Sequence, residues 1–135
     1  MFTVTAVSGP FHALNWYYGW SSLLAAFLTG IPLGLSFHRE DFWGGYTSFR
    51  RRIVRLGHVA LAALGMVNVL FALSPWPRLE NRFAKPASIA FVIGGVAMSA
   101  VCFLAGWKPI FRHLFFIPVI ALISAVVLTL LGAES

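Results

Sequence analysis

The sequence predicts an all-α membrane protein whose four transmembrane helices form an up-down antiparallel bundle. Three observations lead to this prediction: 59% of the 135 residues are hydrophobic, only 10% are charged, and the mean hydropathy is +0.84. A soluble domain carries about a quarter charged residues, and a chain this short has too little interior to bury so much apolar surface. Lipid is the solvent that suits this surface, so we expect residues 1–135 to form a single four-span transmembrane domain.

The first span is predicted at residues 16–36. It opens with a cluster of aromatic rings, which favour the boundary between lipid and water because they have an apolar body and a polar tip: Trp16, Tyr17, Tyr18 and Trp20. The span is close to the roughly 20 residues that a helix needs to cross the hydrocarbon core. The loop that follows, residues 37–52, is also rich in aromatic residues, and we expect part of it to lie in the interface.

The second span is predicted at residues 53–74. It begins among four arginines that anchor it at the headgroups: Arg50, Arg51, Arg52 and Arg55. It ends at Ser74, because the proline that follows cannot continue a helix. The third span is predicted at residues 87–107 and the fourth at residues 111–132, after a very short turn. Short connections between successive spans predict antiparallel neighbours.

The distribution of Lys and Arg predicts the orientation of the bundle. Most of the ten basic residues lie in or beside loops 37–52 and 107–111. The positive-inside rule therefore predicts that these loops are cytoplasmic and that both termini lie outside. We expect the membrane to be the inner (cytoplasmic) membrane of a bacterium. The net charge of +6 favours anionic lipid headgroups over nucleic acid, because the basic residues lie in short segments between apolar runs.

Small and weakly polar residues recur on one face of each of the first three spans. In lipid, small residues let two helix backbones approach, and polar side chains form hydrogen bonds between helices. We therefore predict helix-packing roles for Ser22, Thr29, Gly30, Gly34, Gly65, Asn68, Gly95 and Ser99. A ligand-lined interior is the alternative interpretation of the same faces. Asn68 is expected near the middle of the membrane, where its amide needs a partner.

Two histidines are the candidate cofactor ligands. His58 and His113 each lie near the predicted cytoplasmic start of a span, and these two spans run parallel. Two histidines at one depth on facing helices can hold a b-type haem, with Arg55 and Arg112 as partners for the propionates. The alternative is that both histidines lie at headgroup level, where their polar tips are hydrated. No metal site beyond this haem iron is predicted.

The sequence predicts no enzyme. It contains no phosphate-binding glycine loop and no nucleophilic serine motif. No charged residue lies in the central part of a span, which argues against a proton-coupled transporter. His38 lies in a loop with charged neighbours, where a surface ion-pair cluster is expected, and the sequence identifies no partner for His12.

These observations favour a small non-catalytic integral membrane subunit that packs within a larger membrane complex, such as a respiratory or photosynthetic one. Its expected partners are the lipid bilayer and other membrane protein subunits. The main alternative is a cytochrome-like electron carrier with a bis-histidine haem held by His58 and His113. A protein that contacts lipid, quinone or pigment through its aromatic loop is a third hypothesis, and a small transporter has the least support.

Overall fold

The structure is a computed structural model that describes residues 10–74 and 82–133. Its elements are α1 (Pro10–Phe37), the 3-10 helix η1 (Phe42–Gly44), α2 (Phe49–Leu73), α3 (Ala84–Trp107), the 3-10 helix η2 (Pro109–Phe115) and α4 (Phe116–Ala133). All regular structure in this part of the chain is helical, which confirms the predicted class. Helices α1, α2, α3 and the continuous pair η2–α4 are each long and apolar enough to cross a membrane.

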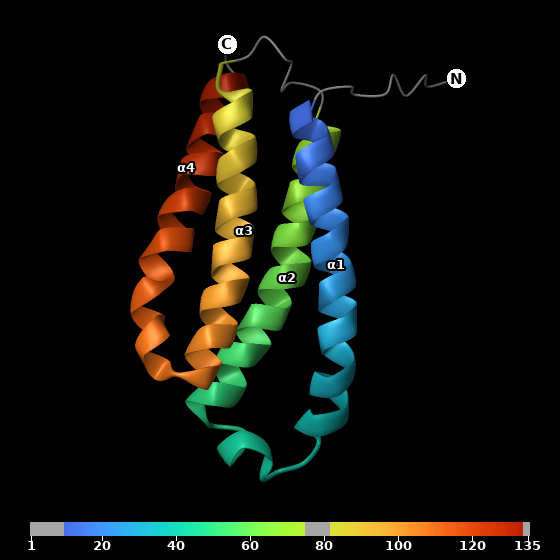
Figure 1. The fold of residues 1–135 in the computed structure, drawn as a ribbon, viewed down its shortest axis with the longest axis vertical. Helices are drawn as coiled ribbons and strands as arrows, with labels where there is room; N and C mark the ends of the chain where they lie inside the picture. The colour runs from blue at the N-terminus through green and yellow to red at the C-terminus, as the bar shows by residue number, and fades with distance from the viewer. Residues whose placement is uncertain (1–9, 75–81, 134–135) are drawn as a thin grey trace, which may run out of the picture.

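The four long helices pack against one another in chain order (Figure 1). Helices α1 and α4 lie at opposite sides of the molecule, with α2 and α3 between them, and α1 also contacts α3. Helix α1 begins and α4 ends at the same end of the bundle, which we call the terminal end. The opposite end, with residues 38–48 and η2, is called the loop end. The predicted up-down antiparallel arrangement is thus confirmed.

The helix boundaries differ from the predicted spans in two informative ways. Helix α1 begins at Pro10 rather than at residue 16, so the aromatic cluster lies within the helix rather than at its start. The fourth span begins with the 3-10 helix η2, and its α-helical part starts only at Phe116. Proline provides the physical reason, because Pro118 has no N–H to donate to the carbonyl of Leu114 and its ring clashes with that carbonyl in an α-helix.

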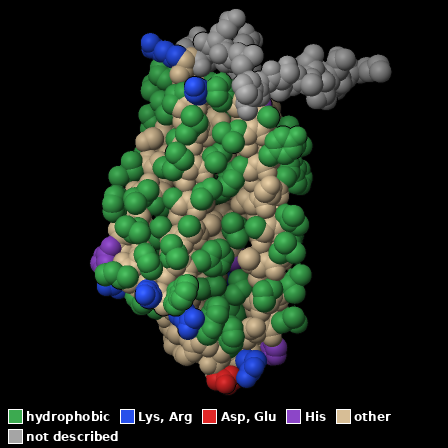
Figure 2. All heavy atoms as spheres, viewed as in Figure 1, with side chains coloured by type: hydrophobic (Ala, Val, Ile, Leu, Met, Phe, Trp, Pro, Cys, Tyr) green, Lys and Arg blue, Asp and Glu red, His purple; other side chains and the backbone are tan. Residues whose placement is uncertain are grey.

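The outer surface of the helices is apolar along most of their length. Phe27, Ile31 and Leu35 on α1 are each more than 60% exposed, and Ile120 and Ile123 on α4 are similarly uncovered. On the face drawn in Figure 2, hydrophobic side chains cover the middle, whereas Lys, Arg, Asp and Glu gather at the two ends. This surface belongs in lipid, with its charges at the headgroups. The chain is therefore an integral membrane protein with four candidate spans.

The buried core is made largely of small residues. One cluster near the loop end contains Ile53, Val54, Cys102 and Ala105. A second cluster near the terminal end contains Phe71, Ala87, Phe91 and Ala125, in which the two phenylalanine rings lie 5.1 Å apart. Small side chains let the helix axes approach closely, so the backbones themselves contribute to the packing.

Candidate functional site

A hydrogen-bonded polar cluster joins α1, α2 and α3 near the terminal end. Asn15 and Asn68 are fully buried, and the Nδ2 atom of Asn15 donates to Oδ1 of Asn68 at 2.7 Å and to the carbonyl of Ser88 at 3.3 Å. The hydroxyl of Ser88 donates in turn to Oδ1 of Asn15. The Nδ2 atom of Asn68 donates to the carbonyls of Leu64 at 2.8 Å and Phe91 at 3.5 Å.

This Asn15–Asn68–Ser88 cluster uses its polar groups to connect helices. Both amide groups give all their hydrogens to protein acceptors, as buried amides must if their desolvation is to be offset. Asn68 lies five residues before the end of α2, which is roughly 8 Å along the helix axis. It is therefore closer to the terminal end of α2 than to the middle of this helix. The arrangement is that of a helix-packing contact.

The predicted packing residues on α1 and α2 lie in different surroundings. The Ser22 hydroxyl donates across the α1–α2 interface to the carbonyl of Leu61 at 2.8 Å. Gly65 lies where a Cβ atom would be 3.0 Å from the carbonyl oxygen of Gly19, so the two backbones meet at this point. Gly34, by contrast, has open space where a Cβ atom would lie, with none of the described residues within 4 Å. The Gly30-xxx-Gly34 spacing is thus not a point of close helix contact at both of its glycines.

Two further predicted packing residues lie on α3. A side chain at Gly95 would collide with the phenol of Tyr18 on α1, so this glycine makes room for the ring. Ser99 is buried, and its hydroxyl is the single fully buried side-chain oxygen or nitrogen without a hydrogen-bond partner in the described ranges. A serine hydroxyl can rotate toward a carbonyl of its own helix, so this position alone does not define a ligand site.

His58 is packed between α2 and α1. Its Nδ1 atom lies 3.1 Å from the hydroxyl of Thr29, and that hydroxyl is also 2.8 Å from the carbonyl of Ala25. Because the hydroxyl has one hydrogen, donation to Ala25 makes the His58 Nδ1–H the donor to Thr29. The imidazole lies against Gly30, where a Cβ atom would be 3.1 Å from its Cε1 atom. The absence of a side chain at Gly30 therefore leaves room for the His58 ring in the α1–α2 interface.

His113 lies in different surroundings from His58. It belongs to η2, which packs on α3, and its side chain is exposed. His58 instead points toward α1, and no hydrogen bond joins the two histidines in the described part of the chain. Arg55 and Arg112 are both exposed. In the described residues His58 thus lies at the α1–α2 interface, whereas His113, Arg55 and Arg112 are on the exposed surface.

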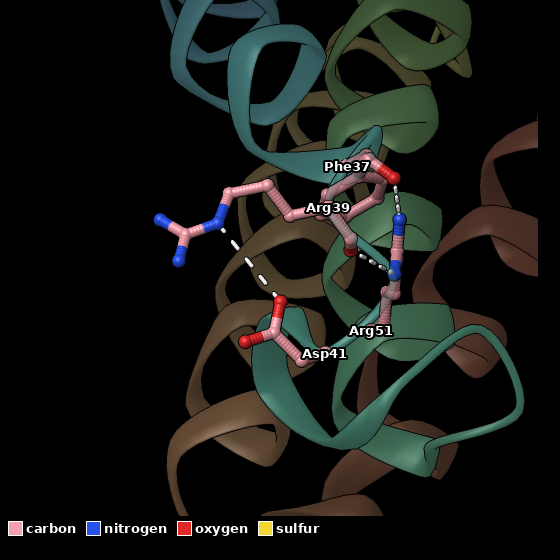
Figure 3. Close-up of polar contacts among 4 residues, drawn as sticks. All are labelled: Phe37, Arg39, Asp41 and Arg51. Atoms are coloured by element: carbon pink, nitrogen blue, oxygen red, sulfur yellow. Dashed lines mark hydrogen bonds and ion pairs between the residues drawn. The ribbon is translucent and has the colours of Figure 1, made fainter.

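Arg51 has a role that the sequence did not indicate. Its guanidinium donates to the carbonyls of Phe37, and of Arg39 at 3.2 Å, at the end of α1 (Figure 3). The guanidinium carbon also lies 4.7 Å from the ring centre of Phe37 and 4.0 Å from that of Tyr46. Only 3% of Arg51 is exposed. This side chain therefore bonds the last carbonyl of α1 and a loop carbonyl, and so joins α1, the loop and α2, rather than anchoring at the headgroups.

The remaining two histidines, His12 and His38, lie on α1 and in the loop that follows it. His12 is buried on α1, and its Nδ1 donates to the carbonyl of Ala72 on α2 at 3.0 Å, a partner that the sequence did not identify. His38 is exposed in the loop after α1. In the same loop Arg39 and Asp41 form an exposed ion pair at 3.9 Å, which contributes little to stability (Figure 3).

Comparison with protein-family models, with curated proteins and with solved structures finds no match for this chain.

Proposed function

We propose that this protein is a small non-catalytic integral membrane subunit that packs within a larger membrane complex. The observation that carries the proposal is the use of the buried polar groups. Asn15, Asn68 and Ser88 bond one another and backbone carbonyls across three helices, and His12, Ser22 and Arg51 join α1 to α2 or to the loop. Each of these groups bonds another part of the same chain, which is the pattern of a scaffold.

The uncovered helix faces also support the proposal. Helix α4 packs mainly on α3, and α1 is flanked by α2 and α3 on one side only, so both outer helices present long apolar faces. Membrane helices associate through close packing of such faces. A larger membrane protein on either side of the molecule would cover α1 or α4 without disturbing the three-helix polar cluster.

The test is purification from native membranes in a mild detergent. A tagged copy, expressed at its natural level, is expected to bring down at least one larger integral membrane polypeptide in a fixed ratio. A tagged, unrelated four-span protein of similar abundance serves as the control. Recovery of the chain alone, at the same expression level and in more than one mild detergent, would contradict the proposal.

The same material tests the cytochrome hypothesis. Because His58 and His113 lie in separate surroundings, we expect that the visible spectrum of the isolated chain has no Soret band that depends on both residues. The His58→Ala and His113→Ala variants are compared with the unmodified chain, all in haem-replete cells. A Soret band lost in both variants would favour the electron carrier over the scaffold.

A further inference from the structure

A groove opens between α1, η1, α2 and α3 at the loop end. Its volume is about 400 Å³, within the range of about 300–1,000 Å³ found for small-molecule sites. Apolar side chains such as Leu33, Val54 and Phe103 line its inner part. Trp43 and Arg50 lie on its wall near the connecting loop. The groove is thus apolar along its length and carries a positive charge at one end.

The depth of the groove is less than the thickness of one leaflet of the membrane. It runs along α1 from Ser36, beside the end of the helix, to Thr29. Seven residues of helix correspond to roughly 10 Å, and half of the hydrocarbon core is about 15 Å thick. A molecule in the groove would therefore have one end at the headgroups and the other among the acyl chains.

The polar groups of the groove are concentrated at its outer end. At the inner end the hydroxyl of Thr29 is already bonded to its own helix and to His58. At the outer end Arg50 is exposed, and its guanidinium carbon lies 4.8 Å from the ring centre of Trp43. This polarity matches an amphiphile with an anionic head and an apolar chain. It matches a quinone less well, because such a ring presents polar carbonyls on both sides.

The loop beside the groove holds a residue in an uncommon conformation. Trp43 has φ 52° and ψ 37°, a left-handed conformation that bulky residues rarely adopt. Its ring stacks on Phe42 at 4.5 Å, and both rings line the groove. Backbone strain of this kind persists where the surroundings hold it, and it occurs often at ligand sites.

From these observations we infer that the groove binds one acyl chain of an anionic phospholipid, with the phosphate at Arg50. The inference is independent of the proposed subunit role. Arg50 forms a charge-assisted contact with the phosphate, and Leu33, Val54 and Phe103 enclose the chain. The two tryptophans of the groove, Trp43 and Trp107, are then in contact with that lipid.

Bromine-labelled acyl chains test this inference through fluorescence quenching. The full chain, with Trp16, Trp20 and Trp76 changed to Phe, is placed in vesicles of phosphatidylcholine. Brominated phosphatidylglycerol or brominated phosphatidylcholine is then titrated in. We expect the anionic lipid to quench the remaining tryptophans at a roughly tenfold lower mole fraction than the zwitterionic lipid, the size of one charge-assisted contact. Equal quenching by both lipids would overturn the inference.

Two arginine variants distinguish lipid binding in the groove from attraction of the lipid by general surface charge. Arg50→Gln is expected to remove most of the preference for phosphatidylglycerol. Arg55→Gln removes the same charge five residues along α2, on a residue that does not line the groove, and is expected to change the preference less than twofold. An equal loss in both variants would mean that only surface charge attracts the lipid, and would overturn the site.

A third variant tests the position of the acyl chain. Leu33→Phe adds volume inside the groove and is expected to weaken quenching by both lipids, with helix content unchanged by circular dichroism. Unchanged quenching in this variant would place the acyl chain outside the groove.

A competition experiment with a short-chain quinone tests the choice of occupant. Loss of quenching by brominated phosphatidylglycerol at equimolar quinone would overturn that choice.

Discussion

At the residue scale, the molecule depends on a few polar side chains that are buried among apolar ones. Arg51 illustrates this, because it is chemically identical to Arg50 and Arg52 but is almost completely buried. The carbonyl of Phe37, the last residue of α1, has no partner within its own helix, and the guanidinium of Arg51 supplies one. The same guanidinium adds a second donor to the carbonyl of Arg39, which also accepts from the backbone N–H of Phe42. A planar guanidinium also stacks on the rings of Phe37 and Tyr46, which an ammonium group does less well.

Arg51→Gln should lower the free energy of unfolding by about 2 kcal/mol, since hydrogen bonds that involve a charged group contribute roughly 1.5–3 kcal/mol. The measurement is an SDS titration in mixed micelles. Arg52→Gln removes the same charge from an exposed position and should stay within about 0.5 kcal/mol of the unmodified chain. Equal effects of the two substitutions would contradict the role assigned to Arg51.

Asn68→Leu should destabilise the protein by about 1 kcal/mol, because hydrogen bonds between membrane helices contribute from about 0.6 to 1.7 kcal/mol. The substitution keeps the number of side-chain heavy atoms and the branching at Cγ but removes the acceptor of Asn15. Thr129→Val is the matched control, since its hydroxyl donates to the carbonyl of Ala125 within its own helix, α4, and not between helices. A double-mutant cycle with Asn15→Leu measures the coupling, and a coupling energy of zero would show that the two amides do not act together.

At the element scale, the crossing of α1 and α2 depends on two glycines whose backbones meet. A Cβ atom at Gly19 would lie 2.8 Å from the carbonyl oxygen of Gly65 and 3.0 Å from the backbone nitrogen of Val69. Backbone atoms cannot rotate away as a side chain does, so any side chain at this position must separate the helices. Farther along α1, Gly34 has no neighbour within 4 Å in the described part of the chain.

Gly19→Ala and Gly34→Ala should therefore have different effects on thermal stability in detergent. Gly19→Ala forces α1 from α2 and should cost about 1–3 kcal/mol, as overpacking does in other proteins. Gly34→Ala meets open space and should be neutral or stabilise the helix by up to about 1 kcal/mol. Similar melting temperatures for the two variants would contradict the described crossing point.

The difference between these two glycines explains what the sequence could and could not predict. The four spans were predictable because their length and polarity are properties of each segment alone. The contact at Gly19 was not predictable, because it depends on how α1 is rotated against α2. The Gly30-xxx-Gly34 spacing on the same helix instead favoured Gly34 as the contact point. The haem hypothesis likewise needs His58 and His113 on facing helices, and the contact of His58 with Thr29 on α1 is not visible in the sequence of α2 alone. The burial of Arg51 depends on the fold of the loop, which four adjacent arginines do not reveal.

At the scale of the whole molecule, the arrangement is a three-helix unit with α4 packed beside it. The polar cluster holds α1, α2 and α3 together at the terminal end, and Arg51 closes α1 onto the loop at the opposite end. The alternation of the helices fixes which segments share a side of the membrane. The distribution of Lys and Arg predicts that the loop end is cytoplasmic.

Single-cysteine labelling tests this orientation. In a Cys102→Ala background, Thr47→Cys reports on the loop end and Ala133→Cys on the terminal end, and both positions are exposed. A membrane-impermeant maleimide applied to intact spheroplasts should label Ala133→Cys, and should label Thr47→Cys only after permeabilisation. The reverse pattern would invert the orientation while leaving the fold unchanged.

The most direct test of the proposed scaffold role is photo-crosslinking in intact membranes, without detergent. A photoreactive amino acid is placed at Ile31 on α1 or at Ile123 on α4, which are 61% and 60% exposed. If the protein is a subunit, at least one position should give a discrete crosslinked band that contains a second, larger membrane polypeptide. Crosslinks to lipid alone from both positions would contradict the central claim.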